Sequence, residues 1–140
     1  MDTPAKLIPL EYHGINFREL RDNQAVGDCV FCGKQMHLYA NIHSGQWDCK
    51  VCGRTGNVPS FLKQIVQHWH EDTDAKHFKL LARQRGIPAP TLRRWGIGYD
   101  GDAWLMHPGD GACDVRIYRP GETIRSTRNC KTALFGSDQL

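Results

Sequence analysis

The sequence has no long hydrophobic run and no secretion signal. No apolar stretch approaches the roughly 20 residues that a membrane-spanning helix requires. The first ten residues contain charges and two prolines where a signal peptide has an apolar core. We therefore expect a soluble cytoplasmic protein with no membrane partner. In a reducing compartment, the six cysteines do not indicate a disulfide framework.

A large net charge is also absent. The chain carries +3 with a pI near 8.6, which is too little for a protein that coats nucleic acid by bulk charge. Between positions 115 and 136, one acid (Glu122) stands among five cations, which are Arg116, Arg119, Arg125, Arg128 and Lys131. Arginine suits phosphate recognition. This segment is therefore either a phosphate-binding face or simply the solvated face of a small sheet.

The sequence lacks the spacing of histidine, carboxylate and nucleophile that would indicate an enzyme using cysteine or histidine chemistry. No internal repeat appears beyond two Cys-x-x-Cys pairs. Cys113 and Cys130 lie outside these pairs, so we expect them to be ordinary thiols.

The two Cys-x-x-Cys pairs predict a metal site. Cys29 and Cys32 form the first pair, Cys49 and Cys52 the second, and sixteen residues lie between the pairs. That length suits one hairpin that returns to close a tetrahedron of thiolates. Four thiolates make a closed structural site with no position for a catalytic water, so structural Zn²⁺ is expected. An iron site of the rubredoxin type uses the same ligands.

The segment between the pairs alternates polar and apolar residues, which predicts a β-strand with one wet face. The polar positions are Gln35, His37, Tyr39, Asn41 and His43. Their amide, imidazole and phenol groups can bond base edges and stack on unpaired bases, and Trp47 on the return strand is expected to join them. The alternative is that the polar face of this small ribbon is simply solvated and binds no ligand.

Helix and strand signals follow the ribbon. Asn57 is the expected cap of a helix whose apolar stripe continues to Trp69. A second helix is expected from a cap at Asp72 or Thr73 to about residue 85, and a third near 91–95. Short strands are expected at 103–106, 115–119 and 124–127, and residues 1–27 form a lead-in with a weak helical signal at 17–21. The fold class is therefore α+β: a small four-cysteine zinc ribbon of antiparallel strands, then helices and a short antiparallel β segment.

Three motifs around the cysteines resemble the N-terminal zinc-binding domain of TOPRIM-type DNA primases, in particular phage primases and primase-helicases. They are residues 27–33 (Gly-Asp-Cys-Val-Phe-Cys-Gly), the stretch 45–57 that ends in Gly-Arg-Thr-Gly-Asn, and 60–62 (Ser-Phe-Leu). Bacterial members commonly have histidine as the second ligand, whereas Cys32 matches the phage type.

A second region extends the resemblance. Residues 81–88, with Arg-Gly-Ile-Pro, and 92–99, ending in Ile-Gly-Tyr, are similar to the opening of the RNA polymerase domain of such primases. Residues 117–121 and 134–136 look like the basic strands that lead to the TOPRIM core. In the family, the catalytic Glu-Gly and Asp-x-Asp motifs lie downstream of this stretch. We therefore expect that this chain alone does not synthesise primers and that Mg²⁺ matters only if a TOPRIM domain is supplied elsewhere.

The resemblance implies a function and a division of the chain. Residues 1–58 would be a zinc-ribbon template-recognition domain, 59–95 a helical segment, and 96–140 the start of the primase polymerase domain. The ribbon would select single-stranded DNA for primer synthesis, with phosphate contacts from Lys34, Lys50, Arg54 and the later arginines. Partners would be a replicative helicase or a primase catalytic domain, in a bacterial cell and on a phage-encoded or phage-derived protein. The alternative is a non-enzymatic zinc-ribbon adaptor that binds a replication or transcription protein.

Overall fold

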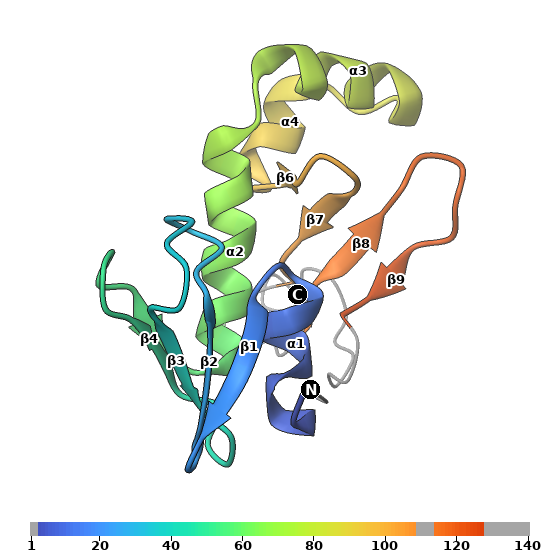
Figure 1. Ribbon diagram of the computed structural model, residues 1–140. Helices are drawn as coiled ribbons and strands as arrows, with labels where there is room; N and C mark the ends of the chain where they lie inside the picture. The colour runs from blue at the N-terminus through green and yellow to red at the C-terminus, as the bar shows by residue number, and fades with distance from the viewer. Residues whose placement is uncertain (1–2, 109–113, 128–140) are drawn as a thin grey trace.

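The computed structural model describes residues 3–108 and 114–127 and has the predicted α+β fold (Figure 1). A short 3₁₀ helix spans Ala5–Leu7. The α-helices are α1 (Ile8–Tyr12), α2 (Val58–Asp72), α3 (Ala75–Arg85) and α4 (Ala89–Arg94). One antiparallel sheet has the order β1 (Asn16–Arg21), β2 (Gln24–Asp28), β3 (Leu38–Asn41), β4 (Trp47–Cys49) and β5 (Thr55–Gly56). A second has the order β6 (Gly98–Tyr99), β7 (Trp104–Met106), β8 (Arg116–Tyr118) and β9 (Arg125–Ser126).

The lead-in prediction for residues 1–27 is wrong for its second half, which forms the β1–β2 hairpin. Asp22 turns the chain with a left-handed φ of 54°, a conformation that aspartate tolerates better than most residues. Gly27 permits close pairing, because a Cβ there would lie 2.5 Å from the carbonyl oxygen of Asn16. The weak helical signal at 17–21 is overridden by tertiary pairing, because β1 pairs with β2 and β2 pairs on its other side with β3, which makes the segment the edge of a five-stranded sheet.

Helix α2 begins where the sequence predicts. The Asn57 side chain accepts a hydrogen bond from the Ser60 backbone N–H at 2.9 Å, and the Ser60 hydroxyl accepts one from the Asn57 N–H at 2.8 Å. This reciprocal capping box satisfies two backbone donors at the start of the helix. The buried stripe of α2 packs in a core shared with residues of both sheets and consists of Val58, Phe61, Leu62, Ile65 and Val66. In Figure 1, α2 lies between the ribbon strands and the second sheet, and α3 and α4 gather at its C-terminal end.

After α2, helix α3 starts slightly later than predicted and helix α4 slightly earlier. The cap of α3 is Asp74, rather than Asp72 or Thr73, and its side chain accepts from the His77 N–H. Helix α4 starts at Ala89 because Pro88 and Pro90 fit its first turn. The three expected strands of the second half are present but one or two residues shorter, and β6 adds a fourth strand.

Most of the buried side chains belong to one cluster that draws on the N-terminal segment, the first sheet, α2 and the second sheet. A smaller cluster comprises Phe78, Leu81, Leu92, Ile97 and Trp104, which join α3 and α4 to the second sheet. The larger core therefore crosses the predicted boundaries at 58 and 95. The division into three segments stays a prediction.

Candidate metal centre and the adjoining sheet face

The two cysteine pairs fold as matching turns. The Cys29 N–H donates to the Lys34 carbonyl at 3.1 Å, and the Cys49 N–H donates to the Arg54 carbonyl at 2.9 Å. Each turn closes through the glycine after its second cysteine, with Gly33 at φ 76° and Gly53 at φ 78°. That conformation favours glycine. The two turns therefore have the same local geometry, and each turn presents two thiols.

The four cysteine sulfurs lie together, as the spacing predicts, and all four Sγ atoms are within 4.8 Å of one another. The Sγ–Sγ distance is 3.9 Å for Cys29 and Cys52 and 3.7 Å for Cys32 and Cys49. A disulfide would need about 2.05 Å, whereas a tetrahedral zinc with Zn–S bonds of about 2.3 Å places its sulfurs about 3.8 Å apart. Distances and donor chemistry therefore both fit a four-thiolate zinc centre.

The centre is buried on one side and open on the other. Cys29 and Cys49 are each 2% exposed, while Cys32 and Cys52 are exposed to solvent. Among the residues that the structure describes, no other group of three or more histidines, cysteines and acids lies close enough to hold a metal ion. A metal held here would thus be fixed by the core and still be reachable by a chelator.

Burial and backbone hydrogen bonds make the thiols unequal. Burial raises the pKa of the Cys29 thiol to about 12, although the N–H groups of Cys32 and Phe31 favour its thiolate. Burial also acts to raise the pKa of Cys49, but the N–H groups of Cys52 and Val51 outweigh it and lower that pKa to about 7. These values describe the metal-free cluster, because a bound divalent cation deprotonates its thiol ligands. Protons therefore compete with metal for this site.

The prediction that the Trp47 ring joins the polar face is wrong, because the ring is buried. The residue is 2% exposed, and its ring packs 5.8 Å from Phe31 and 5.5 Å from Phe61, measured between ring centroids. Its indole N–H donates to the Asn57 carbonyl at 2.9 Å. The reason is register: Trp47 pairs with Ala40 on β3, and paired residues share one face of a sheet. Trp47 belongs to the core beneath the metal centre.

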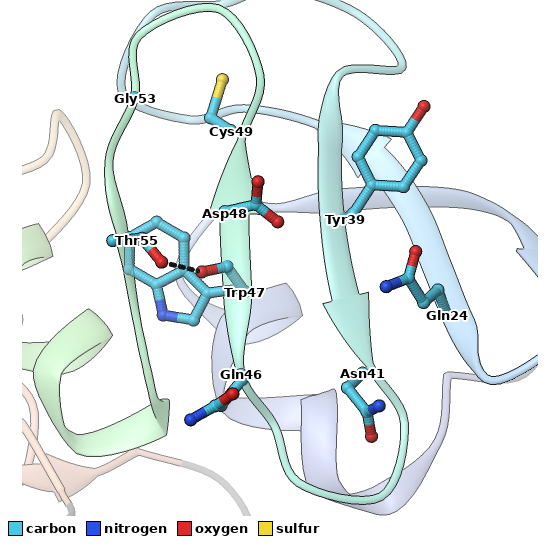
Figure 2. A pocket seen from close by; sticks show the side chains of 9 residues that line it. All are labelled: Gln24, Tyr39, Asn41, Gln46, Trp47, Asp48, Cys49, Gly53 and Thr55. Atoms are coloured by element: carbon cyan, nitrogen blue, oxygen red, sulfur yellow. Dashed lines mark hydrogen bonds between the residues drawn. The ribbon is translucent and has the colours of Figure 1, made fainter.

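The opposite face of the sheet is a polar recess of about 500 Å³ beside the metal centre (Figure 2). Tyr39 and Asn41 lie there as predicted. The residues that sequence reasoning missed in its lining are Gln24, Gln46, Asp48 and Thr55. Register identifies three of these four, because Gln24 pairs with Asn41, Asp48 pairs with Tyr39, and Thr55 pairs with Asp48. The recess thus combines amides, a phenol, a hydroxyl and a carboxylate.

Other residues predicted for this face lie near its ends. The His37 Nδ1 lies 2.6 Å from the Gln35 carbonyl. The Asn41 side-chain oxygen accepts from the N–H groups of His43 and Ser44, which shapes the turn from β3 to β4. His43 is exposed on that turn. Among the lining residues of the recess, Tyr39 and Asn41 are the only two from the predicted polar stretch.

The predicted phosphate contacts of the ribbon surround the metal turns. Lys34 is exposed beside the first turn. Lys50 pairs with Asp48 at 2.7 Å, and its Nζ lies 5.8 Å from the centre of the Tyr39 ring. Arg54 stacks 4.5 Å above the Phe31 ring. Of these three cations, Lys50 is adjacent to the recess.

The later arginines that the structure describes do not form one surface. Arg116 pairs with Ser126 across β8 and β9, whereas Arg125 pairs with Ile117, so the two arginines occupy opposite faces of the sheet. Arg119 makes an ion pair with Asp102 at 2.8 Å. Arg128, Lys131, Cys113, Cys130 and the stretch 134–136 lie outside the described residues.

Two Asp-x-Asp tripeptides occur in the chain, at Asp72–Asp74 and Asp100–Asp102, and three of their four carboxylates make structural contacts. Asp74 caps α3, Asp102 pairs with Arg119, and Asp100 accepts from two backbone N–H groups of its own turn. Within residues 3–108 and 114–127, neither tripeptide belongs to a candidate metal cluster.

No known protein family, curated protein or solved structure matches the chain. Within the described residues, every helix is too short or too polar to span a bilayer. The four-cysteine cluster therefore defines the class of site: a metal-binding module, with zinc as the ion that the donor set favours.

Proposed function

We propose that this chain is the zinc-binding, template-recognition part of a DNA primase, which binds single-stranded DNA for RNA primer synthesis. The observation that carries the proposal is the polar recess on the exposed face of β2, β3 and β4, built beside the four-thiolate centre. The closed centre would fix the turns at the end of this sheet and take no part in chemistry. The sequence resemblance to primase ribbons supplies the class of nucleic acid.

The recess suits unpaired bases better than a duplex. Single-stranded bases can leave the stack, lie on aromatic rings and bond through their edges. The partly exposed Tyr39 ring offers the stacking surface, with the Lys50 ammonium beside it. The amides of Gln24 and Gln46 and the hydroxyl of Thr55 supply donors and acceptors for base edges.

Asp48 gives the recess a polarity that favours bases over phosphates. Its carboxylate lines the recess and is only partly neutralised at the surface by Lys50. A carboxylate repels phosphate but accepts hydrogen bonds from exocyclic amino groups of bases. We therefore expect amino-bearing bases in the recess, with the phosphate backbone toward Lys34 and Lys50.

The test is binding of zinc-loaded protein to a library of short single-stranded DNAs at two salt concentrations. Salt-sensitive binding with a preferred sequence, reduced by Tyr39→Ala, supports template recognition. Stacking on one aromatic side chain contributes about 1–3 kcal/mol, so a loss of affinity of about fivefold to a hundredfold is expected. The matched control is Tyr12→Ala, since Tyr12 is a 39% exposed tyrosine on α1 outside the recess.

A non-enzymatic adaptor for a replication or transcription protein would use the same ribbon without template preference. Absence of DNA binding at low salt, with zinc retained, would replace the primase proposal by this one. Primer synthesis itself would need Mg²⁺ and a TOPRIM catalytic domain supplied elsewhere, with that domain or a replicative helicase as partner.

A further inference from the structure

Helices α3 and α4 form a strongly basic unit that is not part of the proposed site on the ribbon. Residues 75–95 contain no aspartate or glutamate. Their cations are Lys76, Lys79, Arg83, Arg85, Arg93 and Arg94. Among the described residues, no carboxylate forms an ion pair with any of these six. Although the Asp74 carboxylate interacts with Lys76, the unit keeps a large excess of positive charge, which attracts an acidic partner.

An apolar recess opens between this unit and the second sheet. Its floor includes Leu81 from α3, Leu92 from α4 and Trp104 from β7, all less than 5% exposed. Its volume is about 280 Å³. Pockets for drug-sized ligands begin at roughly 300 Å³, so the recess suits one large apolar side chain.

The rim of the recess combines a held cation with exposed apolar groups. The Arg85 guanidinium lies 4.9 Å from the centre of the Tyr118 ring, which restricts its motion. Trp95 is 41% exposed and Ile124 is 45% exposed, and both line the same recess. Large apolar side chains at the edge of an apolar recess mark an interaction surface.

We propose that this recess binds an acidic segment of a partner protein, which inserts one aromatic or large aliphatic side chain and places a carboxylate on Arg85. The apolar floor favours a peptide over a nucleic acid, because a base inserted there would bury its polar edges with few partners. The absence of acids over residues 75–95 excludes a basic partner by repulsion. This site is separate from the ribbon face and does not depend on the proposed template recognition.

The test selects short random peptides displayed on phage against the zinc-loaded full chain. The expected peptides combine aspartate or glutamate with a large apolar residue, and their affinity falls as salt rises. Affinity should drop about tenfold or more with Arg85→Glu and with Ile124→Asp, as at an interface hot spot. Zinc content and circular dichroism establish that the variants are folded.

Two matched controls accompany these variants. Arg83→Glu reverses a charge on the same helix, about 200° away around its axis, and Leu80→Asp changes a 50% exposed apolar residue that does not line the recess. Leu80→Asp and Tyr39→Ala should bind the selected peptides normally, and Arg83→Glu should weaken binding much less than Arg85→Glu, because it changes only the screened charge away from the recess. Selected peptides without acids, or with no sensitivity to Arg85→Glu, would overturn the proposal. Binding of oligothymidylate that is lost with Arg85→Glu and Ile124→Asp, without peptide selection, would assign the surface to nucleic acid instead.

Discussion

Replacement of one cysteine ligand tests the metal centre and the packing beneath it. Cys49 is 2% exposed and is the next residue but one after Trp47 on β4. Its Sγ lies 3.7 Å from that of Cys32. Cys49→Ser removes one of four thiolates and puts a hydroxyl, a much weaker zinc ligand, at the buried side of the site.

The expected cost is comparable to the stability of a whole domain. Structural zinc sites bind with about 10–16 kcal/mol, whereas domains unfold with about 5–15 kcal/mol. The ribbon strands are two to six residues long, too short to replace that contribution from packing alone. Cys49→Ser should therefore release the metal, open the ribbon and expose Trp47, which loses its contacts with Phe31 and Phe61.

Two measurements test the effect of Cys49→Ser. Metal content by mass spectrometry should show one zinc per chain in the wild type and none in Cys49→Ser, and it distinguishes zinc from iron. Tryptophan emission should shift to longer wavelength. The shift should be lost in a Trp47→Phe background, which assigns it to one of the four tryptophans. Cys113→Ser is the matched control and should keep both metal and spectrum. Retained zinc with unchanged fluorescence in Cys49→Ser would refute the ligand set.

Three further changes test the fold. Burial lowers the pKa of the His13 imidazole to about 4. As the pH falls from 6.5 to 4, the unfolded chain therefore binds a proton at His13 before the folded chain does, and the free energy of unfolding should fall by about 3 kcal/mol. Urea titrations should show that His13→Gln lacks this contribution, and equal pH slopes for the variant and the wild type would contradict the role of His13. Asn57→Ala removes the acceptor for Ser60 N–H and should cost about 1 kcal/mol in the same assay, and an unchanged midpoint would argue against the capping box. Gly27→Ala forces a Cβ against the Asn16 carbonyl and should lower stability by about 1–3 kcal/mol, whereas thermal melting at the wild-type temperature would show that β1 and β2 are not so close.

The candidate site was predictable where its parts are close in sequence. Cys29 and Cys32 belong to one tight turn, and Asn57 and Ser60 to one helix start, so local spacing fixes their geometry. The polar face was predicted only in part. Which residues lie beside Tyr39 depends on the neighbouring strands, and Asp48 and Gln24 enter the recess through strand register.

The sequence by itself determined the two cysteine pairs of the candidate metal centre, the capped central helix and the α+β class, because each depends on spacing over a few residues. Only the tertiary structure decided that residues 16–28 join the ribbon sheet, that Trp47 faces the core, and that α3 and α4 frame an apolar recess. These features depend on contacts between distant segments, and a shift of register by one residue would turn every side chain to the other face. Charge counts along the chain show both the arginines at 116–128 and the acid-free stretch 75–95, whereas only the structure shows which cations lie beside a carboxylate, as Arg119 does beside Asp102.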